Sequence, residues 1–565
     1  MRRPDAAPLR WRLALAGWLL GAACAPGQAA PGDRAILDLQ SSRRVESAAL
    51  PGGAGQAVLT QLNPAVNAWL LLSLPTADGS GRVDYHLENP DPRGQQVHLD
   101  PAGRLRISRE GSEEDCAIWP ALAFERAARA RLAYAPLCQG RLSLRNALPG
   151  HRTTLEATTE FLRDHVWGGG AIVGLVKRGL YRDAFVERER PASPAELVEP
   201  AFAVAAGAPP DARLDTLAEP RPLVAEGMGI AALGAGPAWL PGRWYAAAGL
   251  PGVFASVAQP HGMAAAGSAL DGVERQALVF LVAFDLASFE LGFALGTEHP
   301  RLGWSERARA DQVDPKQPGP DGFADAAPLV RTGMLAPALR SRVVATFTGG
   351  FKREHAAFRY GALAGVNHGS HYGFVEQGVV FSRLQPGLST LLVTTDGAVE
   401  MKTWAAGDEQ RLAQVRHARQ NGTALVDRPA GGAPRVGGLV NRWGEGNWSG
   451  SNDEQLRSLR AGACVVERGE RRWLVYGYFS SATPAAMARV FLAYGCRYAM
   501  HLDMNALEHT YLALYPSLSG RRRIEHLAPG MSVLDQQSAE AVLPRFLAFP
   551  DDRDFFYLLS REAPK

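Results

Sequence analysis

Short alternations of apolar and polar residues fill the first part of the chain and predict β-strands. The clearest runs are AWLLLSL, RVDYHLE and QVHLD, and Asp-Pro and Pro-Ala-Gly turns separate them. Because this pattern continues from about residue 31 to residue 150, we predict a small β-rich domain there. Residues 151–238 then hold one predicted helix, TTLEATTEFLRDHVW, and a stretch rich in Pro and Ala that is typical of a linker.

Residues 239–565 combine longer apolar runs with clear helix signals. The run QALVFLVAFDLASFELGFAL predicts a hairpin that turns at residues 286–288, and SRVVATFTGGF and RRWLVYGYF predict two more strands. GDEQRLAQVRHARQNG predicts a helix, and so does SATPAAMARVFLAYGC, where Thr483 caps the start, Pro484 follows and Gly495 ends it. The predicted fold class is therefore α+β, with a small β-rich N-terminal domain followed by a mixed α/β domain.

The first thirty residues have the pattern of an export signal. Arginines precede an apolar run at residues 13–23, and the small residues GAACAPGQAAPG follow it. The run is too short to span a membrane, so we predict a signal peptide over residues 1–30 and a periplasmic or secreted protein. Lipid attachment at Cys24 is an alternative, although Gly21 fits a lipoprotein motif poorly. No later run predicts a transmembrane span in the mature chain.

The charge and the cysteine content indicate which partners and which disulfides to expect. The net charge is only +3, from 60 basic and 57 acidic residues, so a nucleic-acid partner is not predicted. Beyond Cys24, the four cysteines form two pairs that are close in sequence. In an oxidising compartment the local pairing is favoured, which gives Cys116–Cys138 and Cys464–Cys496. Two other connectivities, or free buried thiols, stay possible from the sequence alone.

Common catalytic motifs are missing from the sequence. GNWSG lacks the spacing of a nucleophile elbow, TGGFK lacks the frame of a phosphate-binding loop, and neither HExxH nor CxxC occurs. Polar residues, glycines and aromatics gather instead in four segments: TGGFK at residues 348–352, NHGSHYG at 367–373, WGEGNWSG at 443–450 and MHLDMNALEHTY at 500–511. These four segments are the candidates for a functional site.

Each candidate segment also has a purely structural interpretation. The glycines after Thr348 allow close approach of a ligand, or they only make a tight turn. The pair His368 and His371 suits ligand binding or structural hydrogen bonds better than a metal, because flanking glycines predict a loop. Trp448 can stack on a sugar ring or fill a core.

The order of these elements resembles the phosphodiester glycosidase domains, relatives of the lysosomal enzyme that uncovers mannose 6-phosphate by removing N-acetylglucosamine. The NGGFF turn of that family appears as TGGFK, its LDGGGS stretch as LDMNAL at residues 502–507, and its arginine-bearing RTAIG strand as RSLRAG at 457–462. The resemblance covers residues 239–515 and does not reach the first 200. Thr348 replaces the asparagine of the family, and Met504-Asn505-Ala506 replace its glycines.

This resemblance implies a hydrolase that acts on a glycosyl phosphodiester or a related envelope glycan. Such a substrate carries one negative charge, so arginines and backbone N–H groups are expected around its phosphate, with a carboxylate at the anomeric carbon. The expected catalytic residues are Asp503, Glu508 and His509. The expected substrate-binding residues are Thr348, Gly349, Gly350, His368, His371, Trp448, Arg457, Arg460 and Asn505.

No cofactor and no metal site is predicted, although a metal-dependent hydrolase that uses His368, His371 and His509 is a minor alternative. The main alternative comes from another class: a non-catalytic periplasmic protein on the same fold that binds glycans or assists envelope assembly. The replaced glycines favour this alternative, and the density of polar residues favours the hydrolase. The sequence therefore leaves open whether the protein is an enzyme.

Overall fold

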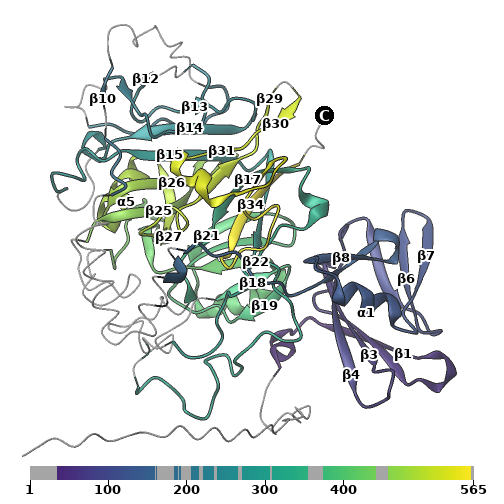
Figure 1. Ribbon diagram of the computed structural model, residues 1–565. Coiled ribbons are helices and arrows are strands. Elements are labelled where there is room, and N and C mark those ends of the chain that lie inside the picture. Colours follow the sequence, from purple (N-terminus) through teal and green to yellow (C-terminus); the bar gives the residue numbers. More distant parts are fainter. Residues whose placement is uncertain are drawn as a thin grey trace, which may run out of the picture. The chain divides into compact units, whose positions relative to one another are not determined.

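Antiparallel sheets are the main regular elements of the computed structural model (Figure 1). The predicted signal peptide and parts of the predicted linker lie outside the described residues. Among the residues described, no helix is long and apolar enough to cross a membrane. The structure describes residues 35–154, 156–158, 161, 184–188, 190–192, 205–215, 221–234, 238–264, 270–305, 308, 310–353, 373–440, 456–518 and 520–561.

The N-terminal part consists of two antiparallel sheets and one helix around their own apolar core. The six-stranded sheet has the order β1-β2-β3-β4-β9-β8, and the other sheet has the order β5-β6-β7. The helix α1 (Leu122–Arg129) buries Phe124 against this core, and the Cys116–Cys138 disulfide closes it. The strands are β1 (Arg44–Ala49), β2 (Gln56–Gln61), β3 (Trp69–Pro75), β4 (Arg82–Glu88), β5 (Gln95–Leu99), β6 (Arg104–Arg109), β7 (Ser112–Ala117), β8 (Tyr134–Leu137) and β9 (Leu142–Arg145).

An eight-stranded antiparallel sheet forms the centre of the remaining chain, in the order β13-β14-β15-β26-β25-β27-β23-β24. The helix α5 (Pro484–Ala493) packs on one of its faces, where Gly462 and Gly477 leave room for Phe491. The Cys464–Cys496 disulfide joins two neighbouring strands of this sheet. The strands are β13 (Tyr245–Ala246), β14 (Val253–Ala258), β15 (Val279–Asp285), β23 (Ala424–Asp427), β24 (Arg435–Val436), β25 (Ser458–Arg468), β26 (Arg471–Ala482) and β27 (Cys496–Met504).

Two five-stranded sheets share the main core with the central sheet. Their orders are β16-β34-β17-β28-β31 and β19-β18-β22-β20-β21. Phe347 of β17 contacts Tyr476 of β26 with ring centroids 5.2 Å apart, so apolar faces of two sheets meet there. The strands are β16 (Phe289–Ala294), β17 (Val343–Thr348), β18 (Phe374–Glu376), β19 (Val379–Ser382), β20 (Ser389–Thr394), β21 (Val399–Thr403), β22 (Val415–Gln420), β28 (Leu512–Leu514), β31 (Glu525–His526) and β34 (Phe555–Ser560).

Short elements complete the described fold. Three small sheets hold β10 (Arg190–Pro191), β11 (Leu223–Val224) and β12 (Ala238–Trp239), β29 (Ser517–Leu518) and β30 (Arg521–Arg522), and β32 (Gln536–Gln537) and β33 (Val542–Leu543). The 3-10 helices are Ile36–Leu39, Pro51–Gly53, Cys138–Gly140, Pro260–Gly262, Pro337–Leu339, Ala406–Gln414 and Pro529–Leu534.

Several predictions from the sequence are confirmed, and two are wrong. The N-terminal β-sheets, both disulfides, the strands β17 and β26 and the helix α5 with its Thr483 cap are as predicted. The predicted hairpin is instead two strands in different sheets. One edge of β15 pairs with β14 and the other with β26, so β15 has no free edge for β16, which pairs with β34. The predicted helix after residue 406 ends at Gln414, and its second half is the buried strand β22.

The larger region is therefore richer in strands than the predicted mixed α/β domain. Long antiparallel pairings, such as β25 with β26, replace the alternation of strand and helix. Residues 35–565 belong to one compact unit. The proposed division into domains at residues 150 and 238 stays a prediction.

Candidate functional site

The segment MHLDMNALEHTY is the end of strand β27 followed by a tight turn into β28. Residues 500–504 belong to the strand, which stops where Asn505 adopts a positive φ of 81°. The turn closes by backbone bonds from His509 and Thr510 to the carbonyl of Ala506. Asp503 consequently lies at the end of a buried strand, and its side chain is only 6% exposed.

Asp503 forms a buried ion pair with Arg553, which precedes strand β34. Arg553 Nη1 donates to Asp503 Oδ2 at 2.8 Å, and the backbone N–H of Met504 donates to Oδ1 at 2.8 Å. Burial raises the pKa of Asp503 to about 6, and the attraction of Arg553 opposes this rise. A carboxyl group with this pKa can exchange a proton near neutral pH.

Further buried charges continue from Arg553. Its Nη2 donates to Glu156, and Lys352 Nζ lies 3.1 Å from Glu156 Oε1 and 3.4 Å from Asp552 Oδ2. Burial acts to raise the pKa of Glu156, but Arg553 and Lys352 hold it well below its usual range. The name "site charge cluster" is used below for Glu156, Lys352, Asp503, Asp552 and Arg553.

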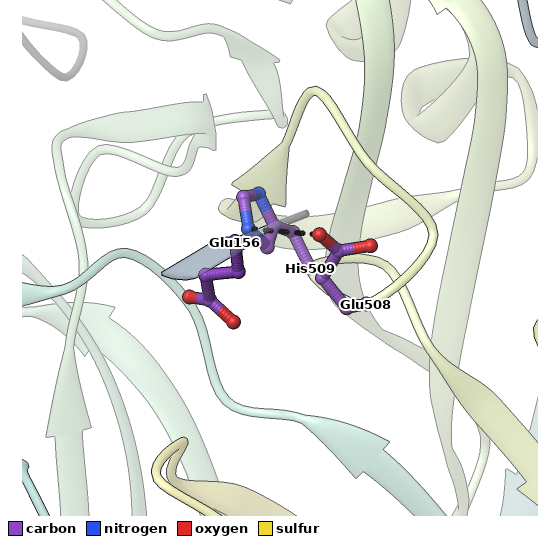
Figure 2. A group of neighbouring side chains, drawn as sticks. All are labelled: Glu156, Glu508 and His509. Atoms are coloured by element: carbon purple, nitrogen blue, oxygen red, sulfur yellow. Dashed lines mark ion pairs between the residues drawn. The ribbon is translucent and has the colours of Figure 1, made fainter. Parts of the chain in front are cut away.

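Glu508 and His509 border this cluster from the turn after β27, as Figure 2 shows together with Glu156. His509 Nδ1 donates to the carbonyl of Met504 at 2.6 Å, and its Nε2 is 4.0 Å from Glu508 Oε1. Burial raises the pKa of Glu508, and the negative charge of Glu156 adds to that effect. Potential ligand atoms of Glu156, Glu508 and His509 all lie within 4.8 Å of one another, so this group can pass a proton or hold a cation.

The glycine turn after β17 packs against buried charges next to this site. A Cβ on Gly349 would stand 2.2 Å from Asp554 Oδ2, and one on Gly350 would stand 2.6 Å from Arg419 Nη1. The N–H of Gly349 donates to the carbonyl of Asp554 at 2.9 Å. Thr348 Oγ1 donates to the carbonyl of Glu508 at 3.2 Å, which ties the glycine turn to the turn after β27.

The described partners of the two predicted arginines, Arg457 and Arg460, are groups other than the Asp503 carboxylate. Arg460 is fully buried, donates to the carbonyls of Leu456 and Ala482, and lies 3.1 Å from Met504 Sδ. Burial lowers the pKa of Arg460 to about 9. Arg457 pairs with Asp271. Arg460 thus touches the residue after Asp503, while Arg457 belongs to another contact.

The predicted residues fall into three groups. Asp503 belongs to the site charge cluster, and Glu508, His509 and Thr348 with its two glycines lie beside it. Asn505 shapes the turn next to the cluster through its N–H bond to the Leu459 carbonyl. Arg457 and Arg460 are placed as described above. His368, His371 and Trp448 lie outside the described residues.

Sequence analysis missed the charged residues that surround Asp503. Lys352 was within a quoted motif but was not singled out, and Glu156 was part of a predicted helix. Asp554 is buried between His299 and Arg419, which hold its pKa below the usual range against the effect of burial. One signal was visible: residues 551–554 read DDRD directly before the apolar run FFYLL, and charges so close to a buried strand must find partners.

Comparison with known proteins gives weak structural likenesses. No family model and no curated protein matches the chain. The fold is similar to the zebrafish N-acetylglucosamine-1-phosphodiester alpha-N-acetylglucosaminidase catalytic domain, auto-inhibited by pro-peptide, with 12% identity over 56% of this chain and 85% of that one and a TM-score of 0.28.

Two further solved structures are similar to the chain. One is a hypothetical protein from Synechocystis, with 10% identity over 87% of this chain and 97% of that one and a TM-score of 0.28. The other is a Burkholderia pseudomallei protein described as exported, with 14% identity over 50% and 74% and a TM-score of 0.21. Likenesses this weak carry no argument about this chain.

Proposed function

We propose that the protein is an exported hydrolase that acts on a glycosyl phosphodiester or a related envelope glycan. The observation that carries the proposal is the buried Asp503 carboxylate at the end of β27, bonded to Arg553 and 4.0 Å from His509 Nδ1. Hydrolysis would break the bond between the anomeric carbon and the phosphate oxygen, with water adding to the carbon and a phosphomonoester leaving. A carboxylate can act on that carbon or on the water.

In this proposal Asp503 is the working carboxylate, and Glu508 and His509 carry a proton beside it. The turn Thr348-Gly349-Gly350 supports the site from the end of β17. The proposed substrate-binding residues are the same as those expected from the sequence: Thr348, Gly349, Gly350, His368, His371, Trp448, Arg457, Arg460 and Asn505.

Export is supported by two features of different kinds. The first thirty residues have the pattern of a signal peptide, and the chain forms two disulfides, Cys116–Cys138 and Cys464–Cys496. Disulfides persist in oxidising compartments such as the periplasm. We therefore propose a periplasmic or secreted location, with lipid attachment at Cys24 as the minor alternative.

A second candidate function is a non-catalytic glycan-binding or envelope-assembly protein. Met504, Asn505 and Ala506 stand where the resembling family has glycines, and larger side chains there narrow the space for a substrate. In addition, Lys352 and Arg553 are already paired with carboxylates of the chain, so less positive charge is available for a phosphate group.

The substitution Asp503→Asn separates these functions. An amide keeps the size of the carboxylate but cannot take up a proton, so turnover of a glycosyl phosphodiester is expected to fall at least about 100-fold, or roughly 2.7 kcal/mol of transition-state stabilisation. Glu508→Gln and His509→Asn should lower turnover less. The measurement is steady-state hydrolysis on a panel of glycosyl phosphodiesters, with melting temperature recorded for each variant.

Asp285→Asn is the matched control, because Asp285 is also buried and paired with one arginine, Arg471, on another strand. This control should change the melting temperature without changing turnover. If the wild-type protein hydrolyses none of the panel but binds envelope glycans equally well with and without Asp503→Asn, the binding function replaces the hydrolase.

A further inference from the structure

Three side chains from distant parts of the sequence come together beside Asp503. Glu156 belongs to the segment that follows the N-terminal sheets, whereas Glu508 and His509 lie in the turn after β27. Their potential ligand atoms are all within 4.8 Å of one another (Figure 2). Two carboxylates and one imidazole are a donor set that divalent transition metals accept in proteins.

The ring of His509 is held in the orientation that metal-binding histidines use. Its Nδ1–H donates to the Met504 carbonyl at 2.6 Å, and Asp503 Oδ1 is 4.0 Å from the same nitrogen. This bond places a proton on Nδ1, so a neutral ring has its lone pair on Nε2, the nitrogen next to Glu508. A carbonyl or carboxylate behind the imidazole is the usual arrangement for a histidine that binds a metal.

The spacing of the ligand atoms is also close to that needed for a shared cation. His509 Nε2 and Glu508 Oε1 are 4.0 Å apart, which is too long for a direct hydrogen bond. Two ligands that each bind one cation at about 2.0–2.2 Å lie roughly 3.3–3.6 Å apart at a tetrahedral angle. The two side chains would therefore have to approach each other by a few tenths of an ångström when a cation binds.

The surrounding charges leave room for a cation despite the nearby basic groups. Lys352 and Arg553 both contact Oε1 of Glu156, and a metal would use a carboxylate oxygen of the same residue. Four carboxylates, those of Glu156, Asp503, Glu508 and Asp552, face Lys352, Arg553 and the partly exposed Arg152. Asp552 Oδ1 is buried and has no hydrogen-bond partner among the residues described. Among the described residues, the ion-pair partner of Glu508 is His509, so the Glu508 carboxylate is available to a cation.

We propose that Glu156, Glu508 and His509 bind one divalent cation of borderline softness, such as Zn²⁺ or Mn²⁺. The imidazole disfavours Ca²⁺ and Mg²⁺, which take oxygen ligands. The side chain of His509 is 20% exposed, which gives a cation access from solvent. The site goes beyond the proposed hydrolase function, since binding is measured without a substrate.

The test measures binding of Zn²⁺ and of Mn²⁺ alone to the full-length, metal-free protein by isothermal titration calorimetry. We expect one cation per chain, a higher melting temperature when it is bound, and an affinity at least about tenfold lower in His509→Asn, Glu508→Gln and Glu156→Gln. The control His526→Asn removes an imidazole that pairs with a carboxylate, Asp535, outside this group and should leave the affinity unchanged.

Two results would overturn the proposal: no binding of either cation, or equal affinity in all variants, which would indicate an adventitious site. If the substitutions prevent folding, anomalous scattering at the zinc edge from crystals of the wild-type protein decides the matter. A peak between Glu156, Glu508 and His509 supports the site, and a peak elsewhere or none refutes it. A protein that binds the cation but hydrolyses nothing would contradict the proposed function and leave this site intact.

Discussion

Two groups of buried charges in this protein are built in different ways. The first, called here the inner ion group, consists of Glu88, Arg145 and Glu376, and each of them is the last residue of its strand. Arg145 Nη1 donates to Glu88, its Nη2 lies 4.0 Å from Glu376, and its guanidinium stacks over Trp69 at 4.1 Å. This group joins the N-terminal sheet to strand β18.

The site charge cluster lies mostly outside regular strands. Lys352 follows the glycine turn, Asp552 and Arg553 precede β34, and Glu156 comes from a helical turn. Asp552 Oδ1 and Arg553 Nε lack partners among the described residues, whereas no polar side-chain atom of the inner ion group does. Satisfied buried networks hold a fold together, and unsatisfied ones are found where a protein binds or reacts. The difference supports a structural role for the first group and a functional role for the second.

Removal of Arg145 tests the structural role of the inner ion group, and it has the largest expected effect on stability. Arg145→Met leaves Glu88 and Glu376 buried with no cation between them, and breaking a buried pair in this way typically destabilises by about 3–5 kcal/mol. The free energy of unfolding in urea should fall by that amount. Arg129→Met is the control, because Arg129 pairs with Glu125 at the surface and the variant should lose at most about 1 kcal/mol. Equal losses in both variants would contradict a structural role for the inner ion group.

The pH dependence of stability gives the next largest effect. Burial raises the pKa of Glu376 from its usual value of 4.5 to about 7, against the attraction of Arg145. Between these pH values the folded state holds a proton that the unfolded chain has released, so stability falls as pH rises. The fall is about 1.4 kcal/mol per pH unit, about 3 kcal/mol in total, and it ends above pH 7.

Glu376→Gln should remove this pH dependence, because an amide resembles the protonated carboxyl and can still accept the bond from the Leu295 N–H. The variant is expected to match the wild type at pH 5 and to exceed its stability at pH 8 by up to about 3 kcal/mol. Chemical denaturation at both pH values measures this. A variant that is less stable than the wild type at pH 8 would show that Glu376 acts as a favourable ion-pair partner there.

Elements with local signals could be predicted from the sequence, and elements set by distant partners could not. The helix α5 carries its own cap and stop, and β17 and β26 are apolar runs bounded by turns. In contrast, VRHARQ has helical propensity but forms the buried strand β22, because the neighbouring strands β18 and β20 offer it backbone partners. A pairing between strands far apart in sequence overrides local preference.

In the candidate site, too, contacts between residues far apart in the sequence could not be predicted. Asp503 was singled out because LDMNAL stands where the resembling family has LDGGGS, all within one short segment. Its partner Arg553 lies 50 residues away, and Glu156 reaches Arg553 from 397 residues away. No pattern of spacing reports such contacts. The charged run DDRD could have indicated that buried partners exist, but the identity of those partners depends on the fold.

The smallest expected effect on stability comes from a substitution in the glycine turn, which lies beside the site charge cluster. A Cβ at Gly349 would stand 2.2 Å from Asp554 Oδ2, and Asp554 cannot move aside without losing its bonds to Arg419 and His299. Gly349→Ala should therefore destabilise by about 1–3 kcal/mol, the usual range for an overpacked site. The control Gly407→Ala has open space around it in the 3-10 helix Ala406–Gln414 and should be neutral or slightly stabilising. Thermal unfolding of both variants measures the difference. If Gly349→Ala is as stable as Gly407→Ala, the charges behind the turn are mobile, and the site charge cluster is less rigid than the inner ion group.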